Sequence, residues 1–378
     1  MDVEAPRGLL RYFNELKDSR MERTKRHTLT DILTIAICAV ICGAEGWTQV
    51  EEFGKAKLKW FQTFLSLPNG IPSHDTFGRV FAKLEPEAFE RCFLKWIEAL
   101  AHKSQGRLIA VDGKTIRRSL DQAGGKAAIH MVSAWCLSNH LVLGQVATDA
   151  KSNEITAIPK LLELLDLNDA VVTTDAMGCQ KRIAKQIVDQ KGDYLLQLKA
   201  NQGNLYEDVK LLFEKCLRDD CQGVAYATAE STNGGHGRVE HRRVWTTWDV
   251  GWCADLKDWK GLRSFICIES VRLVNGHLSR ERRYYICSLD GRDPNRVLAL
   301  VRGHWGVENN LHWCLDVQFR EDDCRIRKGY AAENFSRLNR IALNLLKMQT
   351  NHKAGFRTKR LRAGWDQDYL LKVLTQEI

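Results

Sequence analysis

Two short apolar runs of the sequence each end at an aspartate. Leu108 to Val111 precedes Asp112, and Ala170 to Thr174 precedes Asp175. Runs of this length and composition are typical of buried strands. Two carboxylates held at neighbouring strand ends repel each other unless a cation lies between them, and such hard oxygen ligands suit Mg²⁺ or Mn²⁺. A single aspartate after a strand is more often a turn residue, so the indication comes from the pair.

A third carboxylate would complete two metal sites about 3.5–4 Å apart, the spacing used for in-line phosphoryl displacement. We predict that Glu308 supplies this carboxylate. If residues 302–315 are helical, His312 shares a face with Glu308, and Arg302 and Trp305 lie one to two turns earlier on the same side. An arginine, a histidine and a tryptophan beside a catalytic carboxylate suit the gripping of a phosphate and the stacking of a base.

Two alternatives stay open at this third position. Asp316 and Glu321 are rival candidates for the third carboxylate. In a second interpretation, Trp305 and Trp313 pack a hydrophobic core and Glu308 is one half of a surface ion pair. Spacing alone does not decide between these interpretations.

The elements around the two aspartates predict an α/β fold. Helices are expected at 154–165 and 178–190, and strands at 108–111, 129–136, 141–146, 170–174 and 194–198. Three meandering strands followed by helix, strand, helix and strand is the order of a ribonuclease-H-like layer. Such an order requires a mixed sheet in which the first and fourth strands are neighbours, so that Asp112 lies beside Asp175.

Helical segments precede this layer. Residues 1–104 predict an all-helical N-terminal domain that contacts DNA through basic entry residues. Thr28 or Thr30 is expected to cap a helix that is apolar on most of its surface, and Pro86 to open the last helix of the domain. The interval 48–65 predicts one continuous amphipathic helix.

Strands return after residue 222. Four strand-like runs, two of them joined by the turn Asn275-Gly276, predict a β-rich insertion. Helices follow at 294–303, 305–315 and 331–348. We therefore divide the chain into an N-terminal domain, a first part of the catalytic core, the insertion, and a helical completion of the core with a C-terminal tail, at residues 1–104, 105–222, 223–290 and 291–378.

The composition is that of a basic globular protein. The chain has 378 residues, with 56 Lys and Arg against 47 Asp and Glu, a formal charge of +9. A mild positive excess permits nucleic-acid binding. The longest nearly uncharged apolar run, Ile32 to Ala44, is too short to span a bilayer, and no secretory signal is visible. We therefore expect a cytoplasmic, nucleoid-associated protein without a membrane partner.

The cysteines do not have the spacing of a metal site. None of the 12 cysteines forms a C-x-x-C pair, and the closest pairs are Cys38/Cys42 and Cys216/Cys221. In a chain that we expect to remain in the cytoplasm, we predict neither a zinc site nor a disulfide framework. The cysteines are interpreted as small core residues.

Longer motifs extend the pattern around the three carboxylates. They are Val111-Asp112-Gly113-Lys114, Thr174 to Gln180, Asp193 to Gln202, Gly235 to Glu240, and His304 to Asn309. Together they resemble the DDE transposases of bacterial insertion sequences, and in particular the H-repeat-associated proteins, over nearly the whole chain. The resemblance implies a ribonuclease-H-like catalytic domain with a β-rich insertion. It also implies that Asp112, Asp175 and Glu308 form the catalytic, metal-binding triad.

The chain departs from the wider superfamily around Glu308. Members often carry Tyr, Arg and Lys at fixed offsets from this glutamate, where this chain has Val301, His304 and Leu315. We expect His304, Arg302 or Lys199 to supply the missing phosphate contacts. Trp245 is a hypothetical partner for a flipped base. The full set of expected DNA-binding residues is Lys114, Lys199, Arg238, Arg302, His304 and Trp305.

The resemblance implies a reaction and its partners. Divalent-metal-dependent cleavage at transposon ends would be followed by attack of the freed 3′-hydroxyl on target DNA, without a covalent protein–DNA intermediate. Two Mg²⁺ or Mn²⁺ ions would act in each active site. The partners would be double-stranded DNA, as terminal inverted repeats and target, and a second copy of the chain in a synaptic homodimer. The alternatives are a transposase-derived DNA-binding protein that no longer cuts and a ribonuclease-H-like nuclease.

Overall fold

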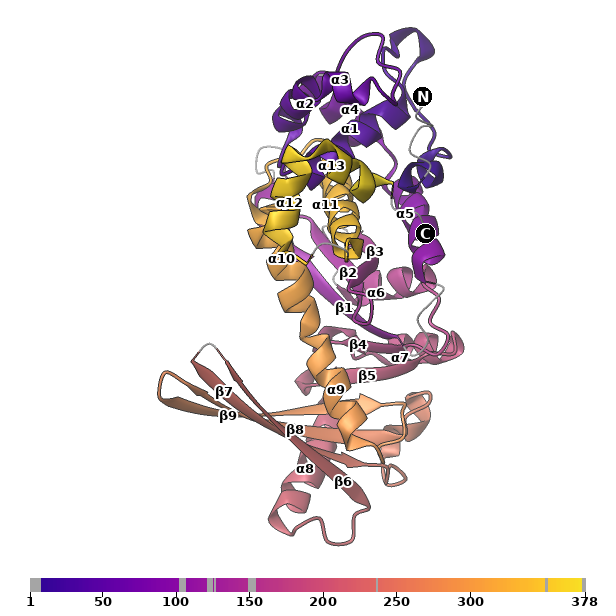
Figure 1. Cartoon of the computed structure of the whole chain (residues 1–378). Helices are drawn as coiled ribbons and strands as arrows, with labels where there is room; N and C mark the ends of the chain where they lie inside the picture. Colours follow the sequence, from indigo (N-terminus) through magenta and orange to yellow (C-terminus); the bar gives the residue numbers. More distant parts are fainter. Residues whose placement is uncertain are drawn as a thin grey trace.

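A nine-stranded mixed sheet runs through the computed structural model, in the order β3-β2-β1-β4-β5-β9-β8-β7-β6 (Figure 1). The structure describes residues 8–101, 107–120, 125, 127–148, 154–235, 237–350 and 353–375. The strands are β1 (Leu108–Thr115), β2 (His130–Cys136), β3 (Leu141–Thr148), β4 (Val171–Thr174), β5 (Asp193–Leu198), β6 (Tyr226–Gly235), β7 (Arg238–Thr247), β8 (Ser264–Val274) and β9 (His277–Cys287).

Strand β1 lies between β2 and β4, as the sequence predicts. It is antiparallel to β2 and parallel to β4, and Val111 of β1 is paired with Thr174 of β4. Asp112 and Asp175 are the next residues along the chain, so they lie side by side. Strand β4 ends before Asp175, whereas β1 continues past Asp112 to Thr115, beyond the end predicted at residue 111. The prediction that the first and fourth strands are neighbours is confirmed.

Helices cover both faces of the sheet. Because side chains alternate along a strand, Leu108 faces one layer and Ile109 the other. Helix α9 (Pro294–His304) packs apolar side chains on the Leu108 face, together with Val171 and Leu195. The Ile109 face is covered by α6 (Glu154–Glu163), α7 (Lys181–Asp189) and α8 (Gly203–Arg218). Helix α8 had not been predicted.

The β-rich segment after residue 222 forms four strands, as expected. Asn275 and Gly276 both adopt positive φ angles in the tight turn between β8 and β9. Strand β9 pairs antiparallel with β5, so the four strands extend the central sheet. Figure 1 shows their outer ends projecting from the body as a twisted ribbon.

The N-terminal region is helical, with one difference from prediction. Its helices are α1 (Leu29–Ile41), α2 (Trp47–Ala56), α3 (Leu58–Phe61), α4 (His74–Lys83) and α5 (Pro86–Ala101). Thr28 caps α1 by accepting a hydrogen bond from the Asp31 amide, and Ser73 caps α4. The interval 48–65 is not one helix, because it breaks at Lys57 into α2 and α3.

The C-terminal helices complete the core of this region. They are α10 (Trp313–Val317), α11 (Ala331–Met348), α12 (Phe356–Trp365) and α13 (Gln367–Leu374). Helices α1 and α11 share one hydrophobic cluster, and Arg360 of α12 donates hydrogen bonds to the carbonyls of Val40 and Ile41. The two ends of the sequence therefore fold together. The expected domain boundary at 104 lies outside the described residues, and the division into four segments stays a prediction.

Two further observations concern the cysteines and the apolar helices. Cys216 and Cys221 form a disulfide, which the prediction of no disulfide framework had not anticipated, whereas the remaining described cysteines are free. Within the described part of the chain, no helix has both the length and the apolarity needed to cross a bilayer.

Candidate active site

A cavity of about 210 Å³ opens where β1, β4 and β5 meet helix α9. All three predicted catalytic carboxylates line it. The lining residues are Asp112, Thr173, Thr174, Asp175, Leu195, Gln197, Lys199, Tyr285, Val301, His304, Trp305, Val307 and Glu308. The structure thus brings together residues that are 196 positions apart, from 112 to 308.

The two aspartates are fixed by backbone hydrogen bonds. Asp112 accepts one from the amide of Gly113 through Oδ1, at 2.9 Å. Asp175 accepts two, from Met177 at 3.0 Å and Gly178 at 3.4 Å, also through Oδ1. Asp175 is therefore a turn residue as well as a cavity residue. Among the described residues, no hydrogen bond reaches its Oδ2 atom.

Glu308 begins a π-helical turn, Glu308–His312, between α9 and α10. A π turn leaves carbonyl groups without their usual partners and is frequent at functional sites. Here Asn310 Nδ2 donates to the carbonyl of Gly306 at 3.0 Å, and Asn309 Nδ2 to that of Trp305 at 3.5 Å. The two asparagines therefore stabilise the wide turn that presents Glu308.

Gly303 allows α9 to approach β1 closely. A Cβ atom at this position would overlap the side chains of Leu108 and Leu137. The helix therefore crosses directly over the base of β1, five residues before Glu308. This close crossing explains why a glutamate so distant in sequence reaches the two aspartates.

His312 completes the cluster from the opposite end of the π turn. Its Nδ1 atom lies 3.6 Å from Asp112 Oδ2 and 3.5 Å from Glu308 Oε2. One potential ligand atom from each of these three residues lies within 4.8 Å of the others. The Nε2 atom of His312 is buried without a hydrogen-bond partner among the described residues. Two carboxylates and an imidazole converging in this way fit a divalent cation.

The carboxylates influence one another electrostatically. Burial, opposed by His312, raises the pKa of Asp112 to about 6, and Glu308 and Glu154 add to the increase. Burial and the charge of Glu154 also raise the pKa of Asp175. The hydrogen bond from His312 lowers the pKa of Glu308. Crowded carboxylates whose charged forms are disfavoured, as in Asp112 and Asp175, are expected where a cation normally neutralises them.

Lys114 does not have the position expected of a DNA-binding residue. Its side chain is only 7% exposed, and its Nζ atom lies 2.7 Å from both Asp316 Oδ1 and Asp322 Oδ1. Because side chains alternate along β1, the Lys114 side chain points toward α10 and the segment after it, and not toward solvent. The ammonium group is therefore enclosed by carboxylates, and its predicted contact with DNA is not supported.

His304 also differs from the phosphate-binding cation that we expected. Its Nδ1 atom lies 3.0 Å from the hydroxyl of Thr173, and the ring lines the cavity. Burial lowers the pKa of His304 to about 4, so that the ring is neutral at pH 7. His304 thus adds no positive charge to the cavity wall.

The other expected DNA-binding residues divide into two groups. Lys199 and Trp305 are exposed and line the cavity, and the guanidinium of Arg283 lies 4.4 Å above the Trp305 ring. Arg302 and Arg238 are exposed outside the lining, Arg302 on α9 and Arg238 at the start of β7. Their contact with DNA stays a prediction.

The hypothetical stacking residue, Trp245, is buried. The guanidinium of Arg243 lies 4.9 Å above its ring, and the side chain belongs to the hydrophobic core. Trp245 is therefore not placed to stack on a base. Its position on β7 accounts for this, because Trp245 is paired with Cys267 of β8 and both side chains belong to the same buried cluster.

One residue of the site was expected in a different role and another was missed. We expected His312 on the face of Glu308 among the side chains that grip a phosphate and not as a metal ligand, although the i, i+4 spacing was a usable signal. Glu154 was not considered, and it hydrogen bonds to His130 at 2.8 Å beside Gly113. No local motif marks Glu154, because it reaches the site from the start of α6.

Comparisons with known proteins show which family the chain belongs to. A family model described as the transposase DDE domain matches residues 103–345, and one described as DDE_Tnp_1-associated matches residues 10–97. The chain is 42% identical over 371 residues to "Putative transposase YncI" of Escherichia coli O157:H7, which covers 97% of this chain and 94% of that protein. It is 41% identical over 374 residues to "H repeat-associated putative transposase YhhI" of Escherichia coli strain K12, covering 97% of each.

These matches define the class of protein. The chain belongs to the DDE transposase family. Within that family it belongs with the H-repeat-associated proteins of bacterial insertion sequences, as the motifs of the sequence had indicated.

Proposed function

We propose that this protein cleaves DNA at transposon ends in a divalent-metal-dependent reaction and joins the freed 3′-hydroxyl to target DNA. The observation that carries the proposal is the convergence of Asp112, Asp175 and Glu308 on one cavity. Among the described residues, no lysine or arginine forms an ion pair with these three carboxylates. A divalent cation would supply the missing positive charge.

We assign the metal ligands to residues of the cavity wall. Asp112, Glu308 and His312 would hold one Mg²⁺ or Mn²⁺ ion, and Asp175 with Asp112 would hold a second. Such ions polarise a phosphoryl oxygen and lower the pKa of bound water. The protein contributes the rigid placement of the ligands: backbone amides fix both aspartates, and the π turn fixes Glu308.

The charges around the cavity support an approach by double-stranded DNA. Lys199 lies on the wall, and Trp305 offers an exposed ring for stacking. Arg302 and Arg238 lie on the side of the sheet that α9 covers, and the charges of both act on Arg242 between them. We propose that this group of arginines holds phosphates outside the cavity. A synaptic homodimer remains an expectation from the family.

We further propose that the catalytic core is ribonuclease-H-like. The support is the strand order β3-β2-β1-β4-β5, with β1 antiparallel to β2 and parallel to β4. Asp112 within β1, Asp175 directly after β4 and the later glutamate on a helical turn support the neighbouring strands and the third carboxylate expected from the sequence.

A cleavage assay tests the proposal. Purified protein would be mixed with labelled DNA carrying the sequences that flank its own gene, with Mg²⁺, with Mn²⁺ or with EDTA. We expect metal-dependent nicks at the ends, which disappear in the isosteric variant Asp175→Asn. Specific binding without nicking would contradict the proposed activity and favour a DNA-binding protein that no longer cuts. Cleavage without preference for the ends would favour a general nuclease.

A further inference from the structure

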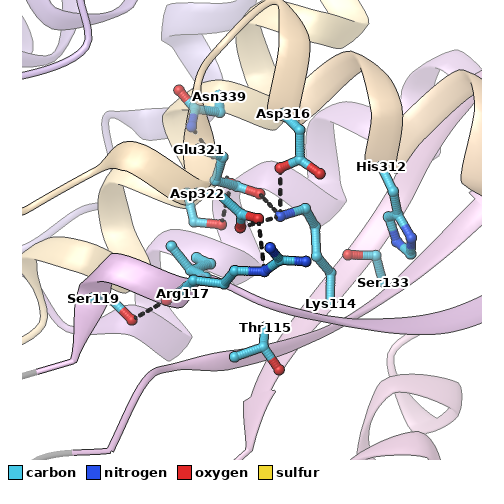
Figure 2. Close-up of polar contacts among 12 residues, drawn as sticks. Lys114, Thr115, Arg117, Ser119, Ser133, His312, Asp316, Glu321, Asp322 and Asn339 are labelled. Atoms are coloured by element: carbon cyan, nitrogen blue, oxygen red, sulfur yellow. Dashed lines mark hydrogen bonds and ion pairs between the residues drawn. The ribbon is translucent and has the colours of Figure 1, made fainter.

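A second polar cluster lies one helical turn beyond the candidate active site. Figure 2 shows Lys114 reaching from β1 into a group of carboxylates carried by α10 and the segment that follows it. Its Nζ atom is 2.7 Å from Asp316, 2.7 Å from Asp322 and 4.0 Å from Glu321. Three carboxylates, from α10 and the segment after it, therefore surround the ammonium group of Lys114.

The spacing of this cluster matches that of the catalytic residues. Lys114 lies two residues after Asp112 on the same face of β1, a distance of about 6.6 Å along a strand. Asp316 lies four residues after His312, a distance of about 6 Å along a helix. The contacts Asp112–His312 and Lys114–Asp316 thus join β1 to two successive elements, the π turn and α10, which follows it directly.

Side chains of α11 form hydrogen bonds with this cluster. The buried Arg340 donates a hydrogen bond to Glu321 Oε1 at 2.7 Å, and Ser336 donates to the same oxygen at 3.0 Å. Arg340 also contacts the hydroxyl of Ser133, which is paired with Asp112 across β1 and β2. Arg340 therefore joins the helix side of the cluster to β2, at the residue paired with Asp112 of β1.

We propose that Lys114 is a positioning residue for the metal site. Its ion pair with Asp316 holds α10 at the separation from β1 at which Glu308 and His312 meet Asp112. This inference rests on the proposed function, since it assigns Lys114 to the same reaction. Lys114 itself touches neither DNA nor metal.

The first test measures whether the Lys114–Asp316 ion pair stabilises α10 in the absence of metal. Two variants are compared by hydrogen exchange in EDTA: Lys114→Met, which keeps the aliphatic stem, and Asp316→Asn, which keeps the shape. We expect the amides of α10 to exchange about tenfold faster or more in each, while those of α7, across the sheet, do not change. Should Lys114→Met fail to fold, Asp316→Asn carries the test, because it leaves Lys114 with two carboxylate neighbours.

The second test measures Mn²⁺ affinity by electron paramagnetic resonance. Loss of residues that orient metal ligands typically weakens metal binding by about 10- to 100-fold, and we expect this for both variants. The matched control is Glu90→Gln, which breaks the buried Glu90–Arg337 ion pair between α5 and α11. This control is expected to lower stability while leaving Mn²⁺ affinity unchanged.

The outcomes separate the two proposals. Unchanged exchange in α10 in both variants would overturn the stabilising role of the Lys114–Asp316 ion pair. Faster exchange with wild-type Mn²⁺ affinity would overturn the positioning role and leave Lys114 a structural residue. Faster exchange in the variants, combined with no Mn²⁺ binding by the wild-type protein, would support the stabilising role of the ion pair and contradict the proposed function.

Discussion

Two clusters of three carboxylates lie side by side in this protein, and they differ in how their charge is neutralised. Asp112, Asp175 and Glu308 line an open cavity and form ion pairs with no lysine or arginine among the described residues. The second cluster consists of Asp316, Glu321 and Asp322. Three cations neutralise it, namely Lys114, Arg340 and Arg117.

The difference separates a ligand site from a structural site. Buried carboxylates are costly unless cations and hydrogen bonds compensate them. In the second cluster the protein supplies that compensation from its own side chains. In the first cluster it supplies one imidazole and backbone amides, and the pKa of Asp112 rises to about 6. We therefore expect a cation from solution to bind at the uncompensated cluster.

The largest effect is expected from breaking the compensated cluster. Glu321→Gln removes the carboxylate that faces Arg340, and both side chains are almost completely buried. An unpaired buried charge costs about 3–5 kcal/mol, so the free energy of unfolding should fall by that amount. Urea denaturation monitored by circular dichroism measures the change. A loss below about 1 kcal/mol would show that this cluster is not stabilising.

The next largest effect is expected from adding metal to the uncompensated cluster. A ligand that binds only the folded state stabilises it by about 2.7 kcal/mol at one hundred times its dissociation constant. Thermal unfolding of the wild-type protein with and without Mn²⁺ should therefore show a concentration-dependent rise in Tm. Glu308→Gln should abolish the rise, and Glu90→Gln, which breaks an ion pair outside both clusters, should retain it. An equal rise in the wild-type protein and Glu308→Gln would place the ion elsewhere.

A smaller gain is expected from neutralising Asp112. In the folded, metal-free protein the pKa of Asp112 is raised to about 6, so the fold keeps a proton that the unfolded chain releases near pH 4. The stability of the metal-free protein should therefore fall as the pH rises from about 4 to 6 and then level off. Asp112→Asn should stabilise it at pH 7.5 by about 1–2 kcal/mol and flatten that slope. Destabilisation at pH 7.5 would contradict the assignment.

The smallest effect is expected at the rim of the compensated cluster. Arg117 pairs with Asp322 at 3.3 Å, but its side chain is 82% exposed. Exposed ion pairs contribute about 0–1 kcal/mol, so Arg117→Met should change the free energy of unfolding by less than that. Denaturation in parallel with Glu321→Gln makes the comparison. Similar losses of unfolding free energy in Arg117→Met and Glu321→Gln would show that burial does not determine how much each ion pair contributes.

Much of the fold was predictable because local signals agreed with the tertiary structure. Helix α11 begins and ends where its apolar periodicity predicted, and the Asn275-Gly276 turn joins two strands as expected. The helix predicted at 48–65 was wrong at Lys57, where the helix breaks. The pairing of β9 with β5 was not predictable, since it joins segments about ninety residues apart without a local pattern.

The site was predictable where neighbouring strands determined it, and unpredictable where side chains from distant segments met. Asp112 and Asp175 followed from the neighbouring strands. The sequence left Asp316 and Glu321 as alternatives to Glu308 for the third carboxylate. In the structure both form ion pairs with cationic side chains. Lys114 was predicted to bind DNA, and its actual partners were not predictable. They lie about two hundred residues away, and no sequence pattern near residue 114 indicates them.

The most direct test of the difference between the two clusters is a crystal structure grown with Mn²⁺, examined by anomalous scattering. We predict manganese peaks in the cavity between Asp112, Asp175 and Glu308, and none beside Lys114. A cavity without manganese at saturating Mn²⁺, or manganese bound among Asp316, Glu321 and Asp322, would contradict both the proposed metal site and the structural role of the second cluster.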